Sequence, residues 1–184
     1  LGEVAENPIA RVHDIGTTID GRDMNLVVIG NPAAEKKIWV IARQHPGETM
    51  AEWYVEGLMD ALLDDANPIA RKLLQRAVFY IVPNMNPDGA VRGNLRTNAA
   101  GANLNREWMT PTLERSPEVL CVKNKIHETG VDMFFDIHGD EALPYNFVAG
   151  NEMLADFTPE RAARQKAFVA QYMAASPDFQ NVYG

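Results

Sequence analysis

Residues 38–48 read IWVIARQHPGE, a short apolar run followed by a polar segment that contains a histidine and a glutamate. An apolar run of this length, bounded by polar residues, is typical of a buried strand. His45 comes three residues after the run. In an open α/β sheet, the loops beyond the carboxyl ends of the strands form the ligand-binding crevice. The stretch therefore predicts a strand and places His45 where such a fold binds its ligand.

Apolar runs and helical segments alternate along the rest of the chain. Strands are expected at residues 24–29, 38–42, 77–82, 131–137 and 145–149, and helices at residues 48–63, 68–76, 117–129 and 159–175. Such alternation is typical of an α/β fold. The connection between the first two strands is too short for a crossover helix, so we expect a mixed, mainly parallel twisted sheet flanked by helices.

Three of the expected helices share one start signal. Asn67, Ser116 and Thr158 each precede a proline, and a capping side chain before proline is favoured at helix N-termini. The apolar spacing of residues 48–63 is helical, which puts Glu48 in the first turn of its helix. A carboxylate in the first turn interacts favourably with the helix dipole.

The apolar run of residues 131–137 ends directly at a second histidine, His138. Together with His45 and Glu48 it offers two imidazoles and one carboxylate, which are ligand types that zinc prefers. Three protein ligands leave a fourth position for water, as in catalytic zinc sites, whereas structural sites have four protein ligands. His-x-x-Glu alone is too short a pattern to identify a metal site. Both histidines, however, follow expected strands, and a core histidine would more often lie within an apolar run.

The expected strand at residues 77–82 leads into the segment PNMNPDG, residues 83–89. Taken locally, Asn-Pro-Asp-Gly is typical of a turn. The residues that follow, 92–108, are rich in arginine and asparagine and poor in apolar side chains. A guanidinium group binds a carboxylate through two parallel hydrogen bonds, so this loop is a candidate carboxylate site. A solvated loop arginine is the alternative for both Arg92 and Arg96.

Four motifs occur in one order along the chain: His-x-x-Glu at residues 45–48, Asn-Pro-Asp-Gly at 86–89, Gly-x-Asn-Leu-Asn-Arg-x-Trp at 101–108 and Asp-Ile-His-Gly at 136–139. This order resembles the zinc metallocarboxypeptidases, the carboxypeptidase A-like family. The segments GNLR, residues 93–96, and HGDE, residues 138–141, resemble its cytosolic carboxypeptidase branch in particular. The matched region runs from about residue 16 to residue 146 and covers most of the chain.

The resemblance implies a zinc-dependent metallocarboxypeptidase that hydrolyses the C-terminal peptide bond of peptides or protein tails through a zinc-activated water. One zinc ion would be bound by His45, Glu48 and His138. The implied architecture is the three-layer zinc carboxypeptidase fold. Known members of the cytosolic branch trim glutamates from protein tails, so an acidic C-terminus is the substrate that analogy favours.

The resemblance also assigns roles within the polar loop. It implies that Asn105 and Arg106 hold the terminal carboxylate of the substrate. Arg96 would polarise the scissile carbonyl and stabilise the oxyanion, because a fixed cation near developing negative charge lowers the barrier. Arg92 lies in the same short loop and is the rival candidate for this substrate contact, since sequence spacing does not rank the two.

Two residues depart from the pancreatic-type members of the family. Those members carry an arginine where this chain has Gly47, so one substrate contact is expected to be absent. They carry an aspartate where this chain has Asn103, and that aspartate accepts a hydrogen bond from the first zinc-binding histidine. An amide oxygen accepts the same hydrogen bond without adding charge, so we expect His45 to be a slightly weaker ligand.

The family's general base is a glutamate far downstream of the third zinc ligand, and no residue of this chain matches it. Glu141 follows His138 by three residues and is the nearest substitute, but a role facing solvent or ordering the loop is favoured over that of the base. Asp136 shares a strand face with His138, where it would support the ligand or form buried hydrogen bonds. The chain starts with Leu1 and stops where another strand would begin. We therefore expect residues 1–184 to be the N-terminal part of a catalytic domain that is incomplete at its C-terminal side, with the base further on.

The composition is that of an ordinary globular domain, with 46% apolar and 23% charged residues and no apolar run long enough to span a membrane. A net charge of -8 argues against a nucleic-acid partner. Cys121 is the single cysteine and is expected to be a core thiol. A single cysteine makes no internal disulfide, which favours a reducing compartment, so the predicted location is the cytoplasm.

Two other functions stay open at the level of the sequence. Aspartoacylase-like relatives share His-x-x-Glu, an Asn-Arg pair and a later histidine, which would make the protein an N-acyl amino acid deacylase. Asn-Pro-Asp-Gly and the context of Trp108 favour the peptidase. The other alternative is a non-catalytic domain that binds zinc and peptide C-termini, because the general base is not found within the chain.

Overall fold

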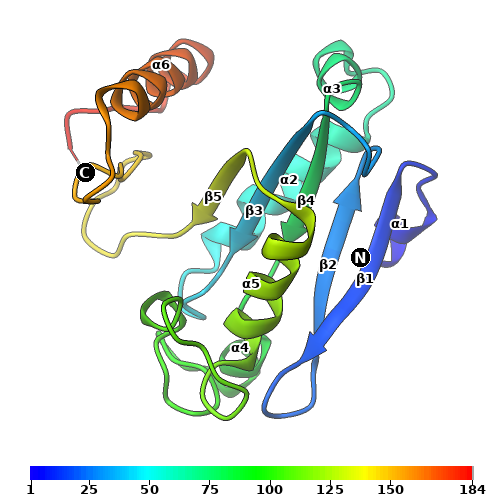
Figure 1. Ribbon diagram of the computed structural model, residues 1–184, viewed down its shortest axis with the longest axis vertical. Helices are drawn as coiled ribbons and strands as arrows, with labels where there is room; N and C mark the ends of the chain where they lie inside the picture. The colour runs from blue at the N-terminus through cyan, green and yellow to red at the C-terminus, as the bar shows by residue number, and fades with distance from the viewer. Residues whose placement is uncertain (184) are drawn as a thin grey trace. The chain divides into compact units, whose positions relative to one another are not determined.

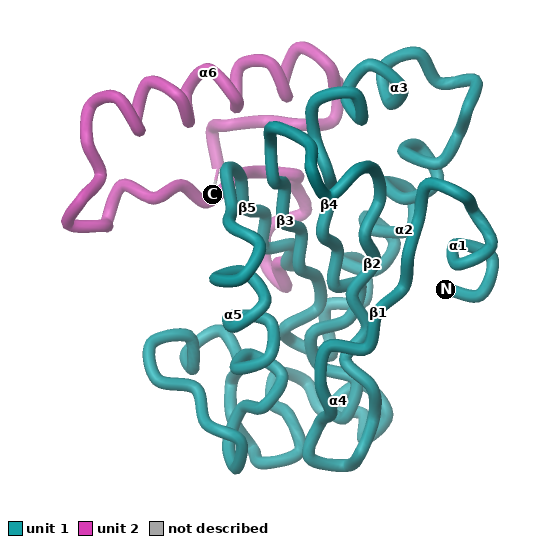
Figure 2. Tube along the Cα trace, turned by 45° about the vertical axis from the view of Figure 1, so that its right-hand side comes forward, with its two compact units in different colours: residues 1–139 teal, residues 140–184 magenta. Residues whose placement is uncertain are grey.

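The computed structural model describes residues 1–183. The chain divides into two compact units, residues 1–139 and residues 140–184 (Figure 2). The first unit contains the five-stranded sheet and the three candidate metal ligands.

The sheet of the first unit is mixed, as predicted. It is formed by β1 (Ala10–Thr17), β2 (Asp23–Ile29), β3 (Lys36–Ala42), β4 (Ala77–Val82) and β5 (Met133–Ile137), in the order β1-β2-β4-β3-β5. Strands β1 and β2 are antiparallel, and so are β2 and β4, whereas β3 is parallel to both β4 and β5. Within residues 1–183, parallel and antiparallel pairings are thus equal in number, and the sheet is not mainly parallel.

The sequence pattern predicts four of these strands and misses β1. Strand β4 matches its prediction residue for residue, and all of its side chains are buried. Strand β1 lies at the edge of the sheet, and its residues Arg11, His13 and Asp14 are all exposed. An edge strand with so many polar side chains carries no apolar run, so periodicity does not mark it.

Helices cover both faces of the sheet, so that helices and sheet together form three layers (Figure 1). Successive residues of a strand point to opposite faces, so β3 contributes to two separate cores. The core beside α2 (Met50–Leu63) contains Val40, Ala42, Val55 and Phe79. The core beside α5 (Pro117–Thr129) contains Trp39, Ile41, Val78 and Val119.

Two of the three helices predicted to begin at a proline have the expected side-chain N-cap. Asn67 accepts hydrogen bonds from two backbone N–H groups of α3 (Pro68–Leu74), and Thr158 accepts one from Arg161. Ser116 makes no capping bond, and its buried hydroxyl has no hydrogen-bond partner among residues 1–183. Helix α5 nevertheless begins at Pro117 as expected, because proline at the first position already has a helical φ.

Glu48 lies outside the helix in which the sequence places it. Helix α2 begins at Met50 with Thr49 as its N-cap. The Glu48 backbone N–H donates to the carbonyl of His45 over 3.1 Å, so the HPGE segment forms a turn of its own before the helix. The prediction of a first-turn carboxylate was wrong, because helical spacing of apolar residues does not mark a helix boundary.

The Asn-Pro-Asp-Gly motif begins a helix and does not form an isolated turn. The helix is α4 (Pro87–Arg92), and Asn86 caps it by accepting a hydrogen bond from Gly89 N–H. Gly89 is closely packed, because a Cβ at this residue would lie 2.4 Å from the carbonyl oxygen of Thr97. The buried carboxylate of Asp88 binds the connection between β1 and β2 through Thr18, Asp20 and Arg22. Helix α4 is thereby attached to both the hairpin and the polar loop that follows.

Two short elements and the single cysteine complete the description of the first unit. A short helix, α1 (Gly2–Glu6), and a 3₁₀ turn, η1 (Leu104–Arg106), are not marked by the sequence pattern. Cys121 packs against the core beside α5 as expected, and burial raises the pKa of its thiol to about 12. A thiol with so high a pKa is unreactive at neutral pH. No helix within residues 1–183 is long and apolar enough to cross a membrane.

The second unit consists of loops and one long helix, α6 (Pro159–Ala175). The strand expected at residues 145–149 is absent from the described chain, and a single bridge pairs Asn146 with Phe179 instead. Tyr172 packs against Phe179 with their ring centroids 4.7 Å apart. The prediction was wrong because an apolar segment becomes a strand only where a neighbouring strand completes its hydrogen bonds.

Candidate metal centre

Strands β3 and β5 bring the two histidines to one edge of the sheet. The strands are parallel neighbours, and their last residues, Ala42 and Ile137, are register partners. His138 follows β5 directly, and His45 follows β3 after two residues. Between strand and ligand, Arg43 has φ 56°, a left-handed conformation that is rare for a residue with a side chain. This bend ends the strand and begins the turn that carries the ligands.

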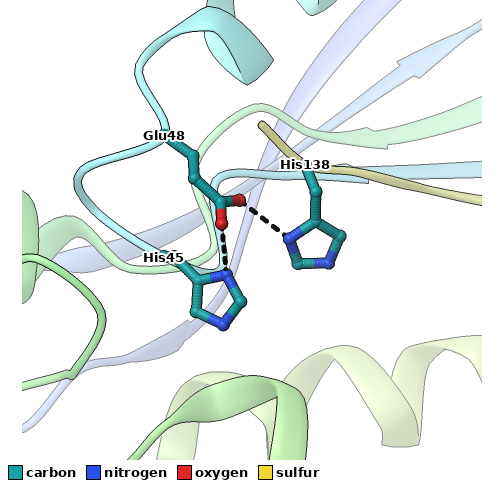
Figure 3. A group of neighbouring side chains, drawn as sticks. All are labelled: His45, Glu48 and His138. Carbon is teal, nitrogen blue, oxygen red and sulfur yellow. Dashed lines mark hydrogen bonds and ion pairs between the residues drawn. The ribbon is translucent and has the colours of Figure 1, made fainter. Parts of the chain in front are cut away.

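Glu48 joins the two imidazoles (Figure 3). Its Oε1 lies 2.7 Å from Nδ1 of His45, and its Oε2 lies 2.8 Å from Nδ1 of His138. The three side chains can each offer one ligand atom such that all these atoms lie within 4.8 Å of one another. The structure therefore brings the three predicted ligands together, with the same nitrogen of each ring aimed at the same carboxylate.

The surroundings favour a charged carboxylate at Glu48. Burial raises the pKa of Glu48, but hydrogen bonds from His138 and from Gly139 N–H, with the positive charge of both histidines, outweigh it and the net shift is downward. Burial lowers the pKa of His138, while Asp136 and Glu48 raise it, and the result is about 9. Because a metal binds only a deprotonated imidazole nitrogen, zinc competes with this proton.

The second nitrogen of each imidazole lies close to an oxygen atom. Nε2 of His45 lies 3.0 Å from Oδ1 of Asn103. Nε2 of His138 lies 2.9 Å from Oδ2 of Asp136, in an ion-pair contact whose geometry falls short of a hydrogen bond. An acceptor on the second nitrogen fixes the ring orientation and tautomer of a metal ligand. Asp136 thus supports His138, as one of its two sequence-based interpretations expects.

Asn103→Asp is expected to strengthen zinc binding by up to about tenfold, because a carboxylate makes the His45 imidazole more basic. Asn103 also caps η1 through the N–H of Asn105, and aspartate serves equally well as a cap. The change should therefore leave thermal stability almost unaltered. The measurement is a competition titration of zinc against a coloured chelator. An unchanged or lower affinity would contradict the proposed role of the amide oxygen.

Of the two candidate arginines, the structure places Arg96 beside the ligands. Its Nη2 lies 3.3 Å from Nε2 of His45, and its Nη1 lies 3.6 Å from Oε1 of Glu48. The side chain is 40% exposed, so the guanidinium borders the ligand cluster and also reaches solvent. Arg92 instead holds Asp20 with two hydrogen bonds of 2.8 and 2.6 Å. A substrate contact by Arg92 would require that ion pair to open.

Gly47 allows the loop of Arg96 to approach the ligands closely. Its backbone N–H donates to the carbonyl of Leu95 over 2.9 Å. A Cβ at Gly47 would lie 2.7 Å from the side chain of Leu95 and 3.0 Å from its carbonyl oxygen. The position where pancreatic-type relatives carry an arginine is therefore closed by Leu95 here.

The predicted carboxylate-binding pair lies on the 3₁₀ turn η1. Asn105 is half-buried, and Arg106 is exposed with one hydrogen bond to the Asn105 carbonyl. Asn103, the N-cap of this turn, is the residue that contacts His45. One short turn thus contains the residue that contacts a candidate metal ligand and the two candidate substrate-binding residues. Substrate binding by these two residues stays a prediction.

Gln44 and Trp108 take part in the site without any sequence signal for that role. Gln44 is fully buried between the bend at Arg43 and the ligand His45. Its amide oxygen accepts a hydrogen bond from Nε1 of Trp108 over 2.8 Å, and its Nε2 donates to Asp136 over 2.6 Å. The partners are 64 and 92 residues away in sequence, so only the fold brings these groups together.

Residues 3–148 match the zinc carboxypeptidase family, which is more than half of the chain. The chain belongs to the zinc carboxypeptidase family. A metallo-carboxypeptidase from Burkholderia cenocepacia is 60% identical, with a TM-score of 0.96 over 98% of this chain and 50% of its own. A Pseudomonas aeruginosa metallo-carboxypeptidase, solved in complex with (2-guanidinoethylmercapto)succinic acid, is 44% identical, with a TM-score of 0.94 over 100% of this chain and 49% of its own.

The chain is also similar to the cytosolic branch. Mouse cytosolic carboxypeptidase 6 is 33% identical over 90% of this chain and 32% of its own length. The chain spans about half the length of the two solved relatives and about a third of the mouse protein. The comparisons confirm the predicted family and the α/β carboxypeptidase-like fold.

Proposed function

We propose that the full-length protein is a zinc-dependent metallocarboxypeptidase that removes the C-terminal residue of peptides or protein tails. The observation that carries the proposal is the convergence of His45 Nδ1 and His138 Nδ1 on the carboxylate of Glu48. Membership of the zinc carboxypeptidase family supports it. Residues 1–184 are then the N-terminal part of the catalytic domain.

The donor set suits one zinc ion. Two imidazole nitrogens and one carboxylate are the ligands of several catalytic zinc sites. Asn103 and Asp136 lie beside the other ring nitrogens, which leaves each Nδ1 free to ligate. When bound, zinc supplies a Lewis acid that polarises a carbonyl and lowers the pKa of water.

The chain's own residues bind and orient the substrate in this proposal. The exposed part of Arg96 donates hydrogen bonds to the scissile carbonyl oxygen as negative charge develops on it. Asn105 and Arg106 hold the terminal carboxylate, with Arg92 as a further candidate contact. An Arg-carboxylate pair positions the substrate as well as binding it. The general base is a glutamate in the part of the protein beyond this chain.

The alternatives are less well supported. The family match is to zinc carboxypeptidases and does not favour an N-acyl amino acid deacylase. A non-catalytic domain that binds zinc and peptide C-termini would require that the remainder of the protein lack a base. The partner we propose is a peptide or protein tail, and the names of the cytosolic relatives support the cytoplasm as the location.

The test is release of free amino acids by the full-length protein from peptides that differ only at the C-terminal residue. We expect release of one residue type from free C-termini and none from the same peptides with an amidated C-terminus. A zinc chelator should abolish release, and added zinc should restore it. Cleavage of N-acyl amino acids alone would support the deacylase, and bound zinc with no cleavage of either substrate would support the non-catalytic domain.

A further inference from the structure

Two hydrogen bonds and one ion-pair contact connect the polar loop to the metal centre through the side chain of Gln44. Trp108 follows the candidate carboxylate pair by two residues and donates its indole N–H to Gln44 Oε1. Gln44 donates in turn to Asp136 Oδ2, and the same oxygen lies 2.9 Å from Nε2 of His138. Four side chains from three separate segments are thus linked up to a candidate metal ligand.

We propose that Gln44 and Trp108 are positioning residues that hold Asp136 against His138 and so set the orientation of this metal ligand. The proposal deepens the proposed function and rests on zinc binding by His45, Glu48 and His138. Neither Gln44 nor Trp108 is assigned a contact with the metal or the substrate.

The direction of the chain follows from the donors available. An indole N–H donates and never accepts, so the amide oxygen of Gln44 must face Trp108. The amide N–H₂ group must then face Asp136, where it can only donate. Trp108 therefore decides which end of the Gln44 amide meets the carboxylate, and a reversed amide would place two oxygens against each other.

Burial of these polar groups makes the loss of one hydrogen bond costly. Gln44 is fully buried, and Oδ1 of Asp136 is buried with no hydrogen-bond partner among residues 1–183. The carboxylate is therefore held at Oδ2 alone, by Gln44 and by its contact with His138. If the Gln44 donor is lost, no other hydrogen bond within residues 1–183 keeps Oδ2 directed at the imidazole. An unpaired buried polar group is costly, so Asp136 would be expected to reorient.

Other contacts hold Gln44 and Trp108 themselves in place. The backbone carbonyl of Gln44 accepts a hydrogen bond from Asn86 over 2.9 Å. The backbone carbonyl of Trp108 accepts one from Lys123 of α5 over 2.8 Å, and its indole ring packs edge-on to Phe134 of β5. Both residues are therefore anchored by contacts outside this chain of contacts, as a positioning role requires.

The experiment measures zinc affinity and the rise in melting temperature caused by zinc, on the full-length protein and its variants. Gln44→Met keeps the length of the side chain and removes both hydrogen bonds, and Trp108→Phe removes the indole donor while keeping an aromatic ring. We expect zinc affinity to fall about tenfold in Gln44→Met and about threefold in Trp108→Phe. The double variant should bind zinc no more weakly than Gln44→Met alone, because both changes break the same chain.

Trp39→Phe is the matched control. Trp39 also donates its indole N–H, to Thr129 and to the carbonyl of Gly130, but it lies in the core beside α5 and outside this chain. We expect Trp39→Phe to lower the melting temperature of the zinc-free and zinc-bound protein equally and to leave the zinc-induced rise unchanged. Gln44→Met should reduce that rise, since ligand stabilisation depends on affinity.

The outcomes separate the two proposals. A wild-type protein that binds no zinc would overturn the proposed function and this inference together. Zinc binding by the wild type, with affinity in Gln44→Met within twofold of it, would overturn the inference alone. If Gln44→Met does not fold, the inference is tested with Trp108→Phe. A zinc affinity of Trp108→Phe equal to that of Trp39→Phe and the wild type would also overturn the inference.

Discussion

Glu48→Gln is expected to lower the zinc affinity of the full-length protein by at least about 100-fold, more than the loss of a residue that only supports a ligand. Glu48 is 5% exposed, accepts one hydrogen bond from the backbone N–H of Gly139 and contacts both histidines. An amide supplies only one acceptor oxygen, adds no charge, and turns an N–H₂ group toward groups that are themselves donors. Zinc content after dialysis and a competition titration would measure the loss.

Glu56→Gln is the control for that substitution. Glu56 lies on α2, the helix that follows Glu48, and is exposed. Its substitution by glutamine therefore removes the same charge at a residue outside the ligand cluster. We expect it to bind zinc like the wild type. Equal zinc affinity in Glu48→Gln and Glu56→Gln would show that the Glu48 carboxylate is not a zinc ligand.

Arg96→Met is expected to lower kcat by about 10²–10³-fold while zinc stays bound, the loss that follows removal of one donor to an oxyanion. Methionine preserves much of the aliphatic side chain and removes the guanidinium that lies 3.6 Å from Glu48 Oε1. Because the donor acts mainly on charge that develops during the reaction, KM should change much less than kcat. Steady-state kinetics with a peptide that the wild type cleaves, beside a zinc titration, would test both statements.

Arg92→Met separates the two arginines that the sequence leaves as rivals. Arg92 is bound to Asp20, and an exposed ion pair of this kind contributes about 0–1 kcal/mol. We expect a small loss of stability and kcat within a few-fold of the wild type. If Arg92→Met lowers kcat strongly and Arg96→Met does not, the two roles are reversed.

Local patterns predict the elements whose signals are local. Residues 77–82, 117–129 and 159–175 coincide with β4, α5 and α6. A run of apolar residues or a proline at the first helical position acts within a few residues, so its effect is visible in sequence. Strand β1 and the wrongly expected strand at 145–149 show the converse, because pairing with a distant partner decides whether such segments become strands.

The order of the strands follows from packing and not from any local signal. The sequence indicates a mixed sheet from the short connection between β2 and β3, but these strands are not neighbours, because β4 lies between them. The antiparallel pairing of β2 with β4 and the parallel pairing of β3 with β4 are both contacts between distant segments. Similar apolar strands can pair in several orders, and in the order observed α2 and α5 each pack on one face of the sheet.

The family, the α/β class and the candidate ligands follow from sequence alone, because His45, Glu48 and His138 belong to motifs that follow apolar runs. The groups that surround these ligands become known from the folded structure. It placed Arg96 rather than Arg92 beside His45, and it brought Gln44 into contact with Asp136. The physical reason is that a ligand's type is a property of one residue, whereas its orientation depends on hydrogen bonds between segments that only the folded sheet brings together.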